Sequence, residues 1–183
     1  LTRILGQGFY LAILLALPMM CILGFASIWM PWLGQQTTNV TLSQSYLQGV
    51  LWGLPALFGY EVFRNILTAI NHPKVITAIA AVGIFLNAIL NYALALGNFG
   101  IPALGLRGIG LSTTIVLWSQ LLIALLFTWF NSEFRIYNLF KKCFRFDSKI
   151  FLEIIGIGFA SSMRYGAKRG FRITLVYLLG ALG

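Results

Sequence analysis

The stretch VITAIAAVGIFLNAILNYALAL, Val75–Leu96, contains no charged residue. A helix needs about 20 mostly apolar residues to cross the ~30 Å hydrocarbon core of a bilayer. Only helices and closed barrels satisfy their backbone in lipid, and the apolar residues here run on without the alternation of a barrel strand. The stretch therefore predicts a membrane-spanning helix.

The composition of the whole chain agrees with a membrane environment. Its 183 residues are 59% hydrophobic and only 9% charged, with a mean hydropathy of +0.87. A soluble domain carries about 25% charged residues, so lipid must be the solvent for most of this chain. The predicted fold class is an all-α, polytopic membrane helix bundle. Because the sequence starts at Leu1 and ends in an apolar run, we expect it to be a piece of a longer protein.

Similar apolar stretches lie before and after Val75–Leu96 in the sequence, and together they predict about five transmembrane helices. Pro18 is expected to kink the first of them, and Pro73 to end the second. Two loops are expected, a Thr- and Ser-rich one at 34–45 and a Gly- and Pro-rich one at 97–108. The other predicted helices cover 4–33, 46–70, 109–130 and a segment from about 150 onward.

The basic residues predict the orientation of these helices. Cytoplasmic loops of membrane proteins are rich in Lys and Arg. If successive helices cross the membrane in opposite directions, Arg107 is the only basic residue of the loops that falls on the outer side. This topology explains the net charge of +9 better than nucleic-acid binding does. The expected location is the plasma membrane (bacterial inner membrane), multi-pass, with lipid and no nucleic acid as partner. The residues on the cytoplasmic side are Arg3, Lys74, Arg135, Lys141, Lys142, Arg145 and Lys149.

The segment 131–149 combines aromatic and basic residues at helical spacing. This pattern is typical of a helix that lies on the inner leaflet with its cations toward anionic lipid. A solvated connector is the alternative interpretation.

Polar side chains inside the predicted spans are the candidate functional residues, because burying them in lipid is costly. Asn87 and Asn91 are four residues apart and share a helix face. They can either hold two helices together or line a cavity for an ion, a proton carrier or a ligand. Ser112, Thr113 and Thr114 can bond to their own helix, and one of them facing the asparagines would complete a polar pocket.

The remaining polar residues favour structural roles. Glu61 and Arg64, three apart, are expected to pair within their helix, which Pro55 could bend. His72 stands alone at a helix end, and Cys21 and Cys143 lie at no metal or redox spacing. No enzymatic activity, metal site or cofactor is therefore expected.

The run NAILNYALALGNFGIPALGLRGIGLSTTIVLWSQ, Asn87–Gln120, resembles the fifth helix, outer loop and sixth helix of the multidrug and toxic compound extrusion (MATE) transporters. Leu54–Lys74 is similar to the family's fourth helix with its cytoplasmic turn, and the last 32 residues resemble the start of the seventh. The family pattern is carried by Gly97, Gly100, Pro102, Gly105 and Gly108, followed by Ser112 and Thr113.

The resemblance implies a monomeric antiporter of about twelve helices in two lobes, which exports small organic molecules, mostly cationic drugs, against Na⁺ or H⁺. This chain would then hold helices three to seven. Residues 1–130 would belong to the N-terminal lobe, 131–149 to the cytoplasmic lobe connector, and 150–183 to the first helix of the C-terminal lobe. In family members a polar cluster handles the coupling cation, and the matching positions here are Asn87, Asn91 and Thr113.

One stretch departs from the family. In MRYGAKRGFR, Met163–Arg172, the family's Glu position is taken by Lys168, and Arg164, Lys168 and Arg172 form one helical stripe. Cations in a bilayer cost about 2.5 kcal/mol each or more, so the stripe is expected to line a wet substrate cavity. It could bind anionic substrates, pair with acids elsewhere, or mark a defective end. The alternative functions are a lipid-linked oligosaccharide flippase of the same superfamily and a non-functional truncated relic.

Overall fold

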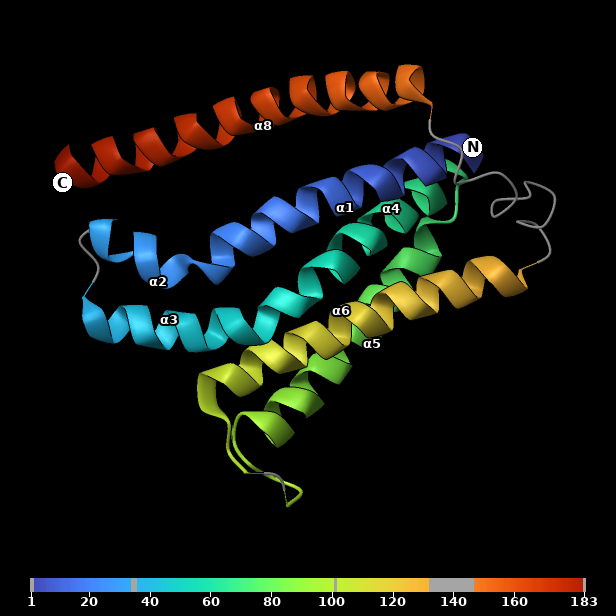
Figure 1. Ribbon diagram of the computed structural model, residues 1–183. Coiled ribbons are helices and arrows are strands. Elements are labelled where there is room, and N and C mark those ends of the chain that lie inside the picture. Colours follow the sequence, from blue (N-terminus) through green and yellow to red (C-terminus); the bar gives the residue numbers. More distant parts are fainter. Residues whose placement is uncertain (1, 34–35, 101, 132–146, 183) are drawn as a thin grey trace.

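A computed structural model describes residues 2–33, 36–100, 102–131 and 147–182, with side chains of the last helix described as far as residue 166. All regular elements in these ranges are helices, which confirms the predicted all-α membrane bundle (Figure 1). Three of the helices, Arg3–Gly24, Pro73–Leu94 and Gly105–Phe130, are long and apolar enough to cross a membrane. The proposed surface helix and most of the connector at 131–149 lie outside the described residues.

The helices follow one another along the chain with short interruptions. The α-helices are α1 Thr2–Gly24, α2 Ala26–Trp29, α3 Thr37–Val50, α4 Leu54–Ala69, α5 Pro73–Leu94, α6 Gly105–Phe130 and α8 Ser148–Leu182, and the 3₁₀ turns are η1 Pro31–Leu33 and η2 Leu51–Gly53. As predicted, Pro73 separates the second span from the third. It is the first residue of α5, and the chain turns just before it at Asn71, whose φ is 63°.

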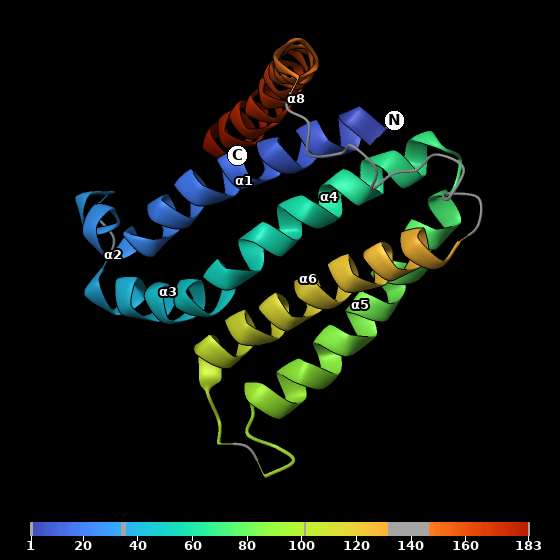
Figure 2. The same cartoon turned by 45° about the vertical axis from the view of Figure 1, so that its right-hand side comes forward.

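The helices lie side by side, with α6 at the centre of the contacts. It packs against α3, α4 and α5, while α1 contacts both α4 and α8 (Figure 2). The starts of α1, α5 and α8 and the end of α6 gather at one end of the bundle (Figure 1). Arg3 and Asp147 meet there with an N–O distance of 3.6 Å. This alternation agrees with the predicted topology, which puts Lys74 and Lys149 at this end and Arg107 at the other.

The polar segment at 34–45 is not a loop as predicted, because it is helical from Thr37 onward. The Thr41 hydroxyl lies 2.9 Å from the Thr38 carbonyl oxygen, and Ser45 donates to the Thr41 carbonyl at 3.0 Å. The hydroxyls of these residues are satisfied by carbonyls of their own helix, so the segment can be helical without polar partners from another helix. Hydropathy alone could not separate such a polar helix from a loop.

The first predicted span is divided in the structure. Helix α1 continues through Pro18 and ends at Gly24, and Phe25 interrupts it with φ −95° and ψ 20°. The short helix α2 follows, and the indole of Trp29 reaches back to donate to the carbonyl of Ile22 at 2.8 Å. This change of direction leads the chain into α3.

The second span is bent where Pro55 predicts it. The turn η2 separates α3 from α4. Pro55 has no N–H and cannot donate to the carbonyl of Leu51, and the N–H of Leu54 bonds to that carbonyl instead. Side chains of α6 bond to two more carbonyls at the bend. Thr114 donates to Gly49 at 2.8 Å, and Trp118 Nε1 donates to Trp52 at 3.0 Å. Helix α6 thus helps to hold the bend.

The Thr114 bond gives a testable prediction. A Thr114→Val change keeps the shape of the side chain but leaves the Gly49 carbonyl without this donor, and such bonds contribute about 0.6–1.7 kcal/mol in membrane proteins. We expect the detergent-solubilised protein to melt a few degrees lower. Thr128→Val is the matched control, because the buried Thr128 hydroxyl donates within α6 itself, to the carbonyl of Ala124 at 2.7 Å. Equal melting temperatures for the two variants would contradict the role given to Thr114.

Glycines let α3 and α6 approach closely beside this bond. A Cβ on Gly110 would overlap the carbonyl oxygen of Tyr46 and lie 2.9 Å from the Cα of Gly49. A Cβ on Gly49 would in turn lie 2.7 Å from the carbonyl oxygen of Arg107. Small residues at helix crossings are the usual means of close packing in membranes. The crossing holds α6 against the bend and fixes the face that α6 turns toward α5.

The apolar core joins α1, α4, α5 and α6. Phe63, which is fully buried, is at its centre, and its ring meets that of Phe9 edge to face at a centroid distance of 5.5 Å. The buried members of the cluster are Leu5, Ala56, Tyr60, Phe63, Ile66, Ile79, Leu121 and Ala124. This core holds the four helices together toward the end where α1 begins.

Candidate functional site

The two asparagines of α5 are bonded to each other and face α6. Asn91 Nδ2 donates to Asn87 Oδ1 at 2.8 Å, so the predicted shared face is confirmed. Ser112 of α6 is fully buried, and its Oγ lies within hydrogen-bonding reach of Asn91 Oδ1. We call Asn87, Asn91 and Ser112 the amide cluster.

The amide cluster retains unused oxygen lone pairs. Ser112 Oγ also lies 2.8 Å from the carbonyl oxygen of Ile109, and its single proton can serve only one acceptor at a time. Each cluster oxygen has two lone pairs, and one bond uses only one of them. Three neutral oxygens thus gather between two apolar helices, and oxygen is the ligand type that hard cations prefer.

Thr113, which was expected to join the asparagines, is bonded elsewhere. Its half-buried hydroxyl donates to the carbonyl of Ile109 at 2.9 Å, within α6. The residue that reaches Asn91 is its neighbour Ser112. Consecutive residues of a helix point about 100° apart, so the choice between them depends on how α6 is rotated against α5. The sequence offered both residues, and packing selects the serine for this bond.

Gln120 extends the polar contact between α5 and α6. Its Nε2 lies in the space that a Cβ of Gly83 would occupy. Gly83 is four residues before Asn87, and Gln120 is eight residues after Ser112. One face of α5 therefore meets polar side chains of α6 at two levels. Sequence reasoning missed Gln120, although Gly83 on the asparagine face was a signal of close approach.

Comparison with known proteins identifies the family to which this chain belongs. Residues 1–93 match the sequence profile of the MatE family. The chain belongs to the MatE family. This result confirms the resemblance to the multidrug and toxic compound extrusion transporters. MatE proteins are membrane-embedded transporters, in agreement with the three helices long enough to span a bilayer.

Several curated proteins are similar to this MatE chain over its whole length. A probable multidrug resistance protein NorM from Synechococcus sp. is 31% identical over 183 residues, with 100% of this chain and 39% of that protein covered. Proteins of the same name from Synechocystis sp. and Bradyrhizobium diazoefficiens are 27% and 31% identical, again over 100% of this chain and 40% and 39% of their own lengths. The chain thus spans about two fifths of these relatives.

The basic stripe of the MatE chain lies apart from the amide cluster. Helix α8 is one uninterrupted helix over Ser148–Leu182, so Arg164, Lys168 and Arg172 do share it at intervals of four. It lies against α1, whereas the amide cluster lies between α5 and α6 beyond α4 (Figures 1 and 2). Arg164 is exposed, and the side chains of Lys168 and Arg172 lie outside the described part. The wet cavity expected around the stripe remains a prediction.

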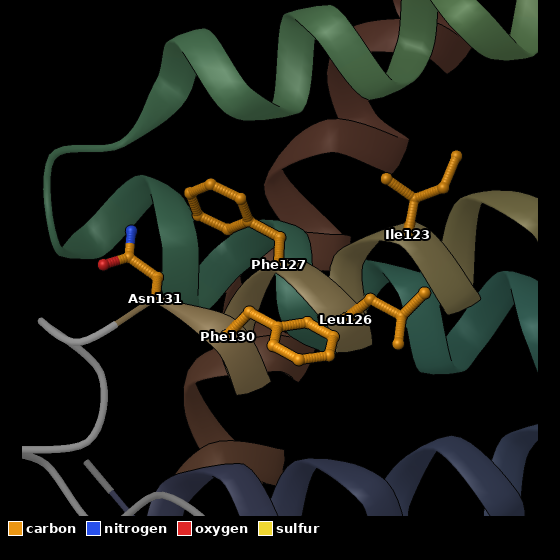
Figure 3. A pocket seen from close by; sticks show the side chains of 5 residues that line it. All are labelled: Ile123, Leu126, Phe127, Phe130 and Asn131. Carbon is orange, nitrogen blue, oxygen red and sulfur yellow. The ribbon is translucent and has the colours of Figure 1, made fainter.

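A hollow of the MatE chain lies at the end of α6. It has a volume of about 480 Å³, and Figure 3 shows its five lining side chains, Ile123, Leu126, Phe127, Phe130 and Asn131. The four apolar ones belong to α6, and Asn131 directly follows its last residue. This composition suits contact with lipid and supplies no group for chemistry. Within the described ranges, no group of three or more His, Cys, Asp or Glu side chains could hold a metal ion.

Proposed function

We propose that this chain is part of a secondary antiporter that exports small organic molecules by alternating access, driven by Na⁺ or H⁺. The observation that carries the proposal is the amide cluster, because buried polar groups in lipid are costly and tend to mark ion or substrate pathways. The names of the curated relatives support multidrug efflux. Within the proposal, residues 1–130 belong to one lobe, 131–149 connect the lobes, and 150–183 begin the second.

The chemistry of the amide cluster sets a condition on the coupling ion. Carboxamides and hydroxyls do not change protonation near neutral pH. The cluster can therefore ligate Na⁺ with its own oxygens, whereas coupling to H⁺ requires a titratable group from another part of the protein. In this proposal Asn87, Asn91 and Ser112 contribute ligands, and Thr113 supports the turn of α6 that carries Ser112.

The proposal includes a location and an assembly state. We place the protein in the plasma membrane as a monomer. In this proposal the starts of α1 and α5 lie on the cytoplasmic side, because they carry the basic residues Arg3 and Lys74. The lipid bilayer is its environment, and no resident cofactor besides the coupling ion is required.

An efflux assay tests the proposed function. The full reading frame that encodes this chain is expressed in a bacterial strain without its own drug pumps, and the cells are loaded with a fluorescent lipophilic dye. We expect dye loss several-fold faster than in cells with the empty vector. Collapsing the Na⁺ gradient alone, and then the H⁺ gradient alone, identifies the coupling ion. Dye loss equal to that of the empty vector, with the protein present in the membrane, would reject the export function.

A further inference from the structure

A groove with a volume of about 290 Å³ lies between α1, α4 and α8, away from the amide cluster (Figure 2). Its lining on α1 runs from Ile4 to Leu15, and its lining on α4 runs from Phe58 to Ile66. Ile154 of α8 forms the third side. These five side chains are all apolar, so the groove suits an apolar occupant.

The groove is extended along the helices. Ile4 and Leu15 are 11 residues apart on α1, so the lining covers about 16 Å at 1.5 Å per residue. Half of a ~30 Å hydrocarbon core is about 15 Å. The groove therefore starts at the end of the bundle where α1 begins and has the length of the acyl layer of one leaflet. Ile4 and Leu15 are 48% and 46% exposed, so both ends of the lining are accessible from the bilayer.

Two polar residues of α4, Glu61 and Asn65, also line the groove, and both have partners. Arg64 Nη1 lies 2.9 Å from Glu61 Oε1, and Asn65 Nδ2 donates to the backbone carbonyl of Glu61 at 2.8 Å. A carboxylate inside a membrane is costly unless it is paired, so we expect Glu61 to keep Arg64. Because this pair has no net charge, the charge that selects an occupant must come from the open end of the groove.

The open end, which we call the mouth, consists of Arg3, Asp147 and Lys149. Arg3 directly precedes Ile4 on α1, and the other two residues stand where α8 begins. Arg3 Nη1 lies 3.6 Å from Asp147 Oδ2, farther than the roughly 2.7–2.9 Å of a charge-assisted hydrogen bond, so the guanidinium retains donors for another anion. Arg3 and Lys149 are exposed, and Glu153 of α8 does not line the groove. The mouth thus carries two cations against one carboxylate.

We propose that the groove binds a phospholipid of net negative charge, such as phosphatidylglycerol, with one acyl chain along α1 and α4 and the phosphate at Arg3 and Lys149. The chain matches the length and the apolar walls of the groove, and basic sites between membrane helices attract anionic headgroups. The guanidinium of Arg3 can donate two parallel N–H bonds to the phosphate oxygens. Glu61 and Arg64 stay paired throughout. This inference concerns the lipid around the protein and goes beyond the proposed export function.

The test compares two lipids with the same acyl chains. The protein is expressed from the full reading frame and purified in detergent, and lipid binding is measured by native mass spectrometry. Dioleoylphosphatidylglycerol is expected to bind several-fold more tightly than dioleoylphosphatidylcholine, whose headgroup has no net charge. Arg3→Gln should weaken phosphatidylglycerol binding about fivefold, the usual contribution of one basic residue near anionic headgroups. The matched control is Lys74→Gln, which removes a positive charge from the start of α5, outside the groove, and should leave the affinity unchanged.

A second pair of variants tests the acyl chain site. Leu15→Trp places a larger side chain at the inner end of the groove and should weaken phosphatidylglycerol binding several-fold. Leu14→Trp makes the same substitution at a neighbouring position that does not line the groove, and it should bind lipid like the unaltered protein. Both leucines are exposed, so neither substitution disturbs the apolar core.

Three results would each overturn the inference. Equal binding of the two lipids would show that the groove does not select for charge. Equal losses in Arg3→Gln and Lys74→Gln would show a general attraction of anionic lipid to this end of the bundle. Unchanged binding in Leu15→Trp would show that something else, such as a further helix of the protein, fills the groove. Because lipid binding is read without transport, none of these results depends on the proposed export function.

Discussion

A Gly110→Ala variant is expected to lose most of its folded protein on extraction into detergent. The added Cβ would overlap the Tyr46 carbonyl oxygen and lie 2.9 Å from Gly49 Cα and 3.0 Å from Val50 N. All three atoms belong to the backbone of α3, so no side chain can rotate away to make room. Overpacking of this kind costs about 3 kcal/mol. The apparent melting temperature of the protein that survives should fall by about 6 °C or more.

The matched control for this change is Gly158→Ala in α8. A Cβ at Gly158 meets no atom within 4 Å, so the same substitution there tests helix propensity alone. Alanine is favoured over glycine in helices by about 1 kcal/mol, and the control should melt at an equal or slightly higher temperature. If Gly110→Ala gave the same size-exclusion elution profile and melting temperature as Gly158→Ala, the close approach of α3 and α6 would be contradicted.

Replacing Asn91 by leucine is expected to reduce gradient-driven export by about tenfold or more, in line with the loss seen when groups around a bound cation are removed. Asn91 is the residue of the amide cluster that contacts both of the others, through Nδ2 to Asn87 and through Oδ1 to Ser112. Leucine fills a similar volume but supplies no oxygen. It removes the donor to Asn87 Oδ1 and leaves Ser112 with the Ile109 carbonyl as its hydrogen-bond partner. The measurement is dye efflux with and without the coupling gradient.

Two comparisons separate coupling from folding in the Asn91 experiment. Asn39→Leu makes the same substitution at an exposed position of α3 and should leave export unchanged. Size-exclusion chromatography of Asn91→Leu should show one sharp peak, because α5 and α6 retain their apolar contacts. Efflux that still responds fully to the coupling gradient in Asn91→Leu would remove the amide cluster from the proposed mechanism.

Local features of the sequence predicted much of this fold. Hydropathy located the long apolar helices, Pro73 marked a helix start, Pro55 marked a bend, and the spacing of Glu61 and Arg64 gave their ion pair. Each of these signals acts within a few residues of its own position. The polar start of α3 was missed because hydropathy measures transfer into lipid, whereas the hydroxyl of Thr41 is satisfied within the helix by carbonyls of the preceding turn.

The candidate site was predictable only in part. The pairing of Asn87 with Asn91 follows from helix geometry, since residues four apart share a face. The selection of Ser112 rather than Thr113 for the bond to Asn91 does not follow from the sequence. It depends on the rotation of α6, which is set by contacts with segments far away along the chain, such as Thr114 with Gly49 and Trp118 with Trp52. Single-sequence patterns carry no information on such long-range contacts.

The positions of Ser112 and Thr114 have a mechanical consequence. The two residues are two apart on α6, so their side chains point about 200° apart around the helix axis. One hydroxyl reaches Asn91 on α5, and the other reaches Gly49 at the bend before α4. A single turn of α6 is thus hydrogen-bonded to α5 on one side and to the end of α3 on the other. Any twist of α6 that pulls Ser112 away from Asn91 must also strain the bond from Thr114 to Gly49, so a displacement at the amide cluster would be transmitted to the bend between α3 and α4.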